Sequence, residues 1–285
     1  MEFWVNQTFN GLSYAALLFL LGGGFTLIFG VMRIVNITHG SFYLVGGYIG
    51  YTVVSLTGNF YLAFLVACIV VALLGGVMER FFLRGLADQD LRQMLITTGI
   101  AFFLQDLCLL IWGGHPLNLT VPRYLSRSVQ IGDFYFPMLR FCMIGAAVFL
   151  FFVLWWFQEK TKAGAMVRAA VDNREMADVL GINVSRVTLG VFGLGALLAG
   201  FGGVVGCAFM GIYPGLDFEL LPYAFVVVII GGMGSLPGAV IGAIVVGLID
   251  NFGKALFPEF SYFTLFAPMA IVLAIRPTGL LGKVS

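Results

Sequence analysis

The sequence predicts an all-α, multi-pass membrane protein with about eight to ten transmembrane helices. Hydrophobic residues make up 60% of the 285 residues and only 10% are charged, whereas about a quarter of the residues of a soluble domain carry charge. The mean hydropathy is +1.02. Apolar segments of about 20 residues, the length that crosses a bilayer as a helix, recur along the chain. We therefore expect a single transmembrane domain over residues 1–285.

Nine apolar segments follow one another along the chain. We expect spans at 12–32, 37–56, 60–82, 93–112, 137–157, 187–211, 220–233, 237–253 and 261–276. The second, seventh and eighth are short or broken by glycine, which allows re-entrant or discontinuous helices there. The longest outer loop covers about 113–136, where Pro116, Pro122 and Gly132 predict irregular or short extended structure.

Basic residues predict the orientation, because Lys and Arg are enriched in cytoplasmic loops. With nine crossings, most of them fall on the side of a loop at about 158–186. The basic residues on the same side of the membrane but outside that loop are Arg33, Arg80, Arg84, Arg92, Arg276 and Lys283. The basic residues on the opposite side are Arg123, Arg127 and Lys254. The loop and the C-terminus are therefore expected in the cytoplasm and the N-terminus outside.

The loop at 158–186 is unusually polar, since Glu159 to Arg186 hold nine of the 29 charges. Apolar residues repeat within it at helical spacing, which predicts one or two short amphipathic helices outside the bilayer. These residues are Met166, Ala169 or Ala170, Met176 or Ala177, and Leu180. Asp172 and Glu175 resemble a capping box, Arg174 and Asp178 are spaced for an ion pair, and Gly181 stands where a C-cap is expected. Such helices either dock on a partner or only join two spans.

Three stretches of the sequence carry a family resemblance. RAAVDNREMADVLGINVSRV (168–187) combines an Arg-Ala pair with a later A-x-x-x-G-I. GGGFTLIFGVMRIVNITHGSFYLVGGYIGY (22–51) has an Asn, a His-Gly pair and a Gly-rich continuation, and GGMGSLPGAVIGAIVVGLID (231–250) is Gly-rich near the C-terminus. In this order, over nearly the whole chain, they resemble bacterial ABC-importer permeases of the branched-chain amino acid type.

The resemblance implies that the cytoplasmic loop docks in a cleft of a separate ATP-hydrolysing subunit. An amphipathic helix in a groove suits that role, because apolar residues anchor it and charges fix its register. The residues expected at this joint are Met166, Arg168, Ala169, Ala170, Asp172, Arg174, Ala177, Leu180 and Gly181. The resemblance also implies two such ATPases, which bind ATP and Mg, a second permease subunit (a related paralogue or a second copy) and a periplasmic substrate-binding protein. The outer loop then either meets that binding protein or serves only as a lid.

The chain itself is not expected to hydrolyse ATP. A phosphate-binding loop reads G-x-x-x-x-G-K-[ST], but Gly253-Lys254 is followed by Ala255 and Gly282-Lys283 by Val284. We expect no cofactor in this chain. The net charge of +1 also argues against a nucleic-acid partner.

Polar residues within the apolar segments are candidates for a translocation pathway. Asn36, Thr38, His39 and Gly40 interrupt the apolar sequence between the first two spans, and Asp106 lies deepest among the acids. Ionisable groups at such depth usually face a bundle interior or a watery cavity. A purely structural role, such as a hydrogen bond to a neighbouring carbonyl, is the alternative for each.

Glycines spaced four residues apart predict close helix crossings, within one subunit or between two. They are Gly202 with Gly206, and Gly234 with Gly238 and Gly242.

The functional prediction is the permease subunit of an ATP-driven importer in a bacterial inner membrane, for branched-chain or related small amino acids. A permease for urea or short amides is an alternative within the same family, and an ion-coupled secondary transporter or channel is one outside it. An intramembrane enzyme finds little support, because the two histidines are far apart and no metal-ligand cluster or nucleophile motif is present.

Overall fold

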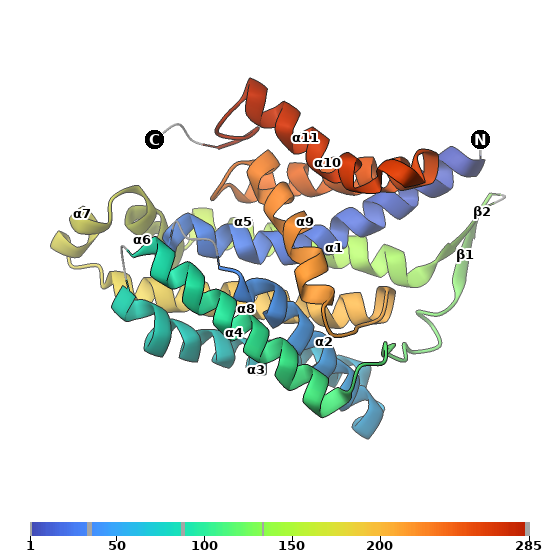
Figure 1. Ribbon diagram of the computed structural model, residues 1–285, viewed down its shortest axis with the longest axis horizontal. Helices are drawn as coiled ribbons and strands as arrows, with labels where there is room; N and C mark the ends of the chain where they lie inside the picture. The colour runs from blue at the N-terminus through green and yellow to red at the C-terminus, as the bar shows by residue number, and fades with distance from the viewer. Residues whose placement is uncertain (1, 33–35, 87–88, 133, 283–285) are drawn as a thin grey trace.

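The computed structural model describes residues 2–32, 36–86, 89–132 and 134–282, most of which are helical (Figure 1). The α-helices are α1 (Glu2–Met32), α2 (Thr38–Thr57), α3 (Phe60–Met78), α4 (Asp90–Trp112), α5 (Met138–Lys160), α6 (Lys162–Asp172), α7 (Arg174–Val179), α8 (Val184–Phe209), α9 (Leu216–Gly231), α10 (Leu236–Leu256) and α11 (Ser261–Ile275). The π-helical turn η1 (Glu79–Leu83) and the 3-10 turn η2 (Arg84–Leu86) extend α3, and η3 (Pro258–Phe260) precedes α11. Strands β1 (Ser128–Ile131) and β2 (Phe134–Pro137) form an antiparallel hairpin.

The all-α membrane fold class is confirmed. Within the described residues, six helical segments are long and apolar enough to cross a membrane: those beginning with α1, α3, α4, α5, α8 and α10. The other three predicted spans correspond to α2, with 20 residues, and to the shorter α9 and α11, with 16 and 15. α2 and α10 are unbroken helices despite their glycines.

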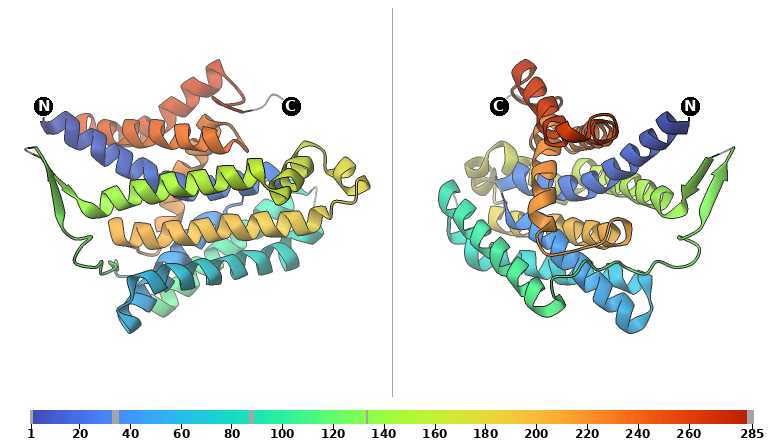
Figure 2. Two further views of the ribbon diagram at one scale, coloured as in Figure 1. Left: turned by 180° about the vertical axis from the view of Figure 1, so that it is seen from behind. Right: turned by 45° about the vertical axis from the view of Figure 1, so that its right-hand side comes forward.

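The helices form an inner and an outer set. In the most apolar stretch of each inner helix most residues are buried: 78% in α1 and 72% in α8. In the outer spans that begin with α3, α4 and α5, only 28%, 22% and 17% of the residues are buried, respectively. The outer helices expose large apolar side chains such as Leu110, as expected for a surface that faces lipid. The long helices α1, α5, α8 and α10 run along the bundle (Figure 2), whereas α9 crosses it steeply (Figure 1).

Glycines bring α2 and α8 into close contact. A Cβ added to Gly46 would lie 2.5 Å from the Cα of Gly200, and one added to Gly203 would collide with the carbonyl oxygen of Tyr43. Any larger residue at these positions would force the two backbones apart. The predicted packing glycines Gly202 and Gly206 lie on the same helix, where they face Leu20 and the Tyr43 ring, respectively.

A second close crossing joins α9 to α10. Gly238 lies against the backbone of Gly231, and Gly242 lies against the carbonyl of Val227. Gly234 was expected to continue this helical spacing, but it lies before α10 in a left-handed turn with a φ of 80°. It packs instead beside Gly30 near the end of α1.

One end of the bundle is formed by α6 and α7 together with neighbouring helix ends, and is called the α6–α7 end (Figure 1). There Arg84 Nη2 donates a hydrogen bond to the carbonyl oxygen of Ser185 at 3.2 Å, which ties the turn after α3 to the start of α8. Residues 232–234, between α9 and α10, also lie here, because Gly232 packs against Gly282 and Gly234 against Gly30.

The opposite end holds the β1–β2 hairpin and the start of α1 (Figure 1). Leu117 pairs with Ile212 there in an isolated β-bridge, so the predicted loop at 113–136 contains short extended structure. The Trp4 and Phe252 rings are 5.6 Å apart, which places the last turns of α10, with Lys254, at this end. Arg33 and Lys283, two of the residues used to predict orientation, lie outside the described residues.

Candidate functional site

The polar loop folds into two short helices whose ends are capped by side chains. Thr161 Oγ1 accepts a hydrogen bond from the Gly164 amide at 3.0 Å, at the start of α6. At the start of α7, Asn173 Oδ1 accepts from the Met176 amide at 2.9 Å. The capping residue is therefore Asn173, and Asp172, which had been expected to cap, is the last residue of α6.

α7 ends at Val179, and Gly181 terminates it two residues later, as the sequence predicts. Gly181 has a φ of 84°; its amide donates to the Asp178 carbonyl, and the Ile182 amide donates to that of Ala177, both at 3.0 Å. These paired bonds define a Schellman motif, which favours glycine because a Cβ is strained at positive φ. The motif turns the chain sharply from α7 into α8.

One face of this α6–α7 segment packs on the start of α8. Val167 (6% exposed), Ala170 (5%) and Ala177 (1%) are buried, the two alanines together with Val184. Ala170 and Ala177 were both expected to contact a partner subunit. They cannot do so in this arrangement because they hold the segment to its own bundle, and Ala169 is only partly exposed.

The opposite face exposes large apolar side chains. Met176 is 55% exposed, Val179 82% and Leu180 72%, and Met166 on α6 is 39% exposed. We call these four residues the apolar tip. Met166 and Leu180 were expected at the joint, whereas Met176 was given only as an alternative to Ala177 and Val179 was missed.

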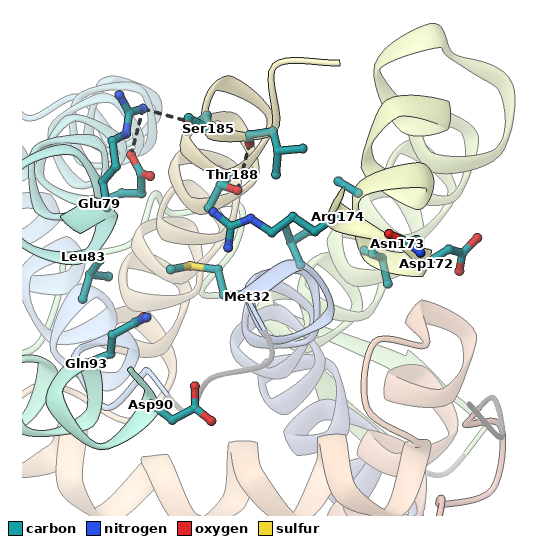
Figure 3. Close-up of a pocket in the computed structure, with 15 residues that line it drawn as sticks. Met32, Glu79, Leu83, Asp90, Gln93, Asp172, Asn173, Arg174, Ser185 and Thr188 are labelled. Carbon is teal, nitrogen blue, oxygen red and sulfur yellow. Dashed lines mark hydrogen bonds and ion pairs between the residues drawn. The ribbon is translucent and has the colours of Figure 1, made fainter. Parts of the chain in front are cut away.

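The charged side chains of the segment make different contacts. Arg168 Nη1 is 3.9 Å from Glu159 Oε2, and both side chains are substantially exposed. The predicted pair between Arg174 and Asp178 does not form: Asp178 Oδ1 instead accepts from the Val184 amide at 3.4 Å. Arg174 points towards a cavity of about 490 Å³ between the segment and the bundle (Figure 3).

A polar centre lies within the bundle where α2 and α9 begin. Thr38 Oγ1 donates to the Thr97 carbonyl of α4 at 2.7 Å, and His39 Nε2 is 2.9 Å from the Leu21 carbonyl of α1. Both residues are fully buried, and Asn36 is 3% exposed with no partner for either side-chain polar atom. A Cβ on Gly40 would lie 2.7 Å from the Asp217 carbonyl, so only glycine lets the two helix ends meet.

The buried acid of this centre is Asp217, on the first turn of α9. It is 2% exposed, and its Oδ2 accepts a hydrogen bond from Ser41 Oγ at 2.8 Å, whereas Oδ1 has no partner. A carboxylate is favoured at this position because the α9 N-terminus carries partial positive charge. The expected spans at 187–211 and 220–233 had left Asp217 in the outer loop between them. The signal that would have found it is an acid two residues after Gly215, at the start of a short span.

Asp106 does not belong to this centre. It is exposed on the outer face of α4, whereas the buried face of that helix carries Gln93, Thr97 and Ala101. Asp106 follows Ala101 by five residues, which is about 140° around a helix with 3.6 residues per turn. Depth along the span was therefore a poor guide to the direction of the side chain.

A second buried acid, Asp250, lies near the other end of the bundle. Its Oδ2 is 2.7 Å from Lys254 Nζ, and its Oδ1 accepts from Tyr223 Oη at 3.2 Å. The Lys254 ammonium also lies over the Tyr14 ring, 5.8 Å from its centroid. These contacts join α10 to α9 and α1. Among the residues that the structure describes, no group of three His, Cys, Asp or Glu is arranged to hold a metal ion.

Comparisons with known proteins identify the family. The chain is 27% identical to the high-affinity branched-chain amino acid transport system permease protein BraD of Pseudomonas aeruginosa, over 98% of this chain and 96% of that protein. It is 28% identical to the corresponding LivH protein of Escherichia coli, over 99% and 96%. The solved structure of PsaBC from Streptococcus pneumoniae in complex with Fab shares the fold, with a TM-score of 0.50, 12% identity, and coverage of 93% of this chain and 89% of that one.

A family model described as the branched-chain amino acid transport system / permease component matches residues 7–273. This match covers far more than half of the chain, and the polytopic helical fold agrees with it. The chain therefore belongs to the family of permease components of branched-chain amino acid transport systems.

Proposed function

We propose that this chain is the membrane-spanning subunit of an ATP-driven importer that moves branched-chain or related small amino acids into the cytoplasm. Family membership and the names of BraD and LivH support the transport role. In the proposal, ATP and Mg are bound by two separate ATPase subunits, because no G-x-x-x-x-G-K-[ST] motif occurs in this sequence. A second permease subunit and a periplasmic substrate-binding protein complete the assembly.

The apolar tip is the single observation that carries the coupling role. Val179 and Leu180 expose most of their surface, although the other face of the same segment is packed on α8. Exposed apolar clusters on an otherwise charged segment are typical of partner surfaces. The tip would fill an apolar cleft in the ATPase, with Arg168 and Asp172 around its edge and Gly181 setting its direction. Arg174, which was also expected at this joint, points instead into the cavity between the segment and the bundle.

The proposed orientation puts the α6–α7 end in the cytoplasm, so that the chain starts outside and ends inside. Arg80, Arg84 and Arg92 lie towards this end along with the charges of residues 159–186. Arg123 and Arg127 belong to the opposite end, but the charge imbalance still favours the α6–α7 end as cytoplasmic. This orientation is required for the ATPases to reach the apolar tip.

The polar centre is the part of the bundle that we propose borders the translocation route. Asn36, His39 and Asp217 all retain at least one buried polar atom without a partner. Each such atom costs about 1–3 kcal/mol when it is left unpaired, so their retention favours a function in which water, substrate or a second helix arrangement satisfies them. The meeting of two helix N-termini resembles the discontinuous helices of other transporters, whose positive ends face anionic groups.

Reconstitution tests the proposed function. The permease, its ATPases and its binding protein would be assembled in proteoliposomes and supplied with labelled leucine, isoleucine, valine or urea. ATP-dependent uptake of a branched-chain amino acid is the expected result. Uptake of urea alone would favour the alternative substrate class. Ion-driven uptake by this chain without ATPases would replace the importer with a secondary transporter.

A further inference from the structure

The cavity beneath the α6–α7 segment has the composition of a ligand site. Its volume is about 490 Å³, within the range of roughly 300–1,000 Å³ that small-molecule pockets occupy. Five segments form its walls: the end of α1, the turn after α3, the start of α4, the α6–α7 segment and the start of α8. It thus lies between the part that we propose contacts the ATPase and the helices that form the bundle.

The wall formed by the bundle carries negative charge and free hydrogen-bond acceptors. Glu79 is 2% exposed and Gln93 1%. Glu79 Oε2 lies 3.6 Å from Arg84 Nη2 but accepts no hydrogen bond, and Gln93 Oε1 has no partner. Asp90 adds a second carboxylate to the same side. Two buried acceptors lining one cavity are unusual, because buried polar atoms are normally paired.

The wall formed by the α6–α7 segment supplies the opposite charge. Figure 3 shows Arg174 reaching from α7 into the cavity towards Met32 and Thr188, opposite Glu79, Leu83 and Gln93. Arg174 has no ion pair within the described chain, whereas Arg84 already contacts Glu79 and the Ser185 carbonyl. Asp172 points away from Arg174 in the same view. Leu83 beside Glu79 and Met32 beside Arg174 add apolar surface to the cavity.

We propose that this cavity binds a free α-amino acid from the cytoplasm and that the bound ligand restrains the α6–α7 segment. The ammonium group would lie on the wall that carries Glu79 and Gln93 Oε1, to which Asp90 adds a second carboxylate, and the carboxylate would lie at Arg174. An aliphatic side chain would pack on Met32 and Leu83. A ligand with only one of the two charges leaves one wall unpaired, so zwitterions are preferred over simple acids or amines.

The position of the ligand predicts its effect. It would bridge α7, through Arg174, to the α3–α4 region of the bundle, through Glu79 and Gln93. A bound ligand would restrict movement of the α6–α7 segment relative to the bundle when the ATPases open and close. Amino acid that accumulates in the cytoplasm would therefore slow the transport cycle. The proposal that a ligand with both charges binds here rests on the residues of the cavity alone. The choice of a branched-chain amino acid and the cytoplasmic location rest on the proposed function.

The test uses the complete importer in lipid nanodiscs, without binding protein, titrated with L-leucine in a calorimeter. The analogues leucinamide, which lacks the carboxylate, and 4-methylpentanoate, which lacks the ammonium, would be titrated in parallel. Both should bind about tenfold more weakly than leucine or worse, and Glu79→Gln should weaken leucine binding to a similar extent. Glu175→Gln is the matched control, because Glu175 lies on α7 outside the cavity and should leave leucine affinity unchanged.

Asp90→Asn provides a second variant in case Glu79→Gln lowers stability, since Asp90 is exposed. With leucine-loaded binding protein already saturating, further leucine should reduce ATP hydrolysis by the wild type but not by Asp90→Asn. Absence of saturable leucine binding, or equal binding by the wild type and both cavity variants, would overturn the proposal. Leucine uptake by the same importer in proteoliposomes, with its binding protein, is measured separately: uptake without cavity binding overturns the cavity site alone, and lack of uptake overturns the substrate assignment.

Discussion

Replacing Val179 and Leu180 of the apolar tip together by serine should weaken the ATPase association without destabilising the permease. Full burial of a valine or leucine side chain is worth about 1.5–3 kcal/mol. The two residues expose 82% and 72% of their surface, so a partner that covers the exposed part would gain about 2–5 kcal/mol from the pair. Losing this contribution raises the Kd about 30- to 4000-fold.

The measurement is the Kd of the ATPase subunit for nanodisc-embedded permease by biolayer interferometry. Leu56→Ser is the control, because Leu56 is 80% exposed but lies on α2 away from the α6–α7 end. Its Kd should equal that of the wild type, and the thermal midpoint of the double variant should be unchanged since neither side chain is buried in the permease. A double variant that binds the ATPase within about twofold of wild type would refute the docking surface.

Three further predictions concern packing and strain. Gly181→Val should reduce substrate-stimulated ATP hydrolysis in the assembled importer, because a left-handed conformation costs a β-branched residue about 1–2 kcal/mol or more. Unchanged hydrolysis would count against a role of the Schellman motif in coupling. Gly46→Val should lower the thermal midpoint, because overpacking typically costs about 1–3 kcal/mol. Gly99→Ala is the control and should leave the midpoint unchanged, because nothing lies within 4 Å of a Cβ added there. Equal midpoints for the two variants would contradict the close α2–α8 crossing. Lys254→Gln should lower the thermal midpoint of the detergent-solubilised protein more than Asp250→Asn does. It leaves the nearly buried Asp250 carboxylate without its cation, whereas Lys254 itself is half exposed. The reverse order of midpoints in a thermal-shift series would show that burial of the Asp250 charge does not determine the stability of the two variants.

Hydropathy and small-residue spacing predicted most of the architecture, because a bilayer imposes a length and composition on each span. Each predicted apolar segment is a helix, and Gly202, Gly206, Gly238 and Gly242 all lie at helix contacts. Gly181 was predictable for a similar reason, since a positive φ strongly favours glycine.

Side-chain direction was less predictable. Asp106 and Asp217 are both acids near apolar segments, and nothing in the one-dimensional pattern shows that the first turns outwards and the second pairs with Ser41. That contact joins residues 176 positions apart, so it depends on how α2 and α9 meet. In the α6–α7 segment, the apolar repeat was identified, but Ala170 and Ala177 face the bundle. Helical spacing alone does not indicate which apolar residues pack inwards and which stay free.

The dimensions of α9 constrain the order in which the protein can be inserted. Its 16 residues extend about 24 Å, less than the roughly 30 Å of a bilayer core, and they include Pro222. Ten of the 16 are buried against other helices. Such a helix is not expected to partition from the translocon into lipid by itself. We expect it to be retained at the translocon until it can pack on α1 and α2, so that membrane insertion depends on the junction where Gly40 meets Asp217.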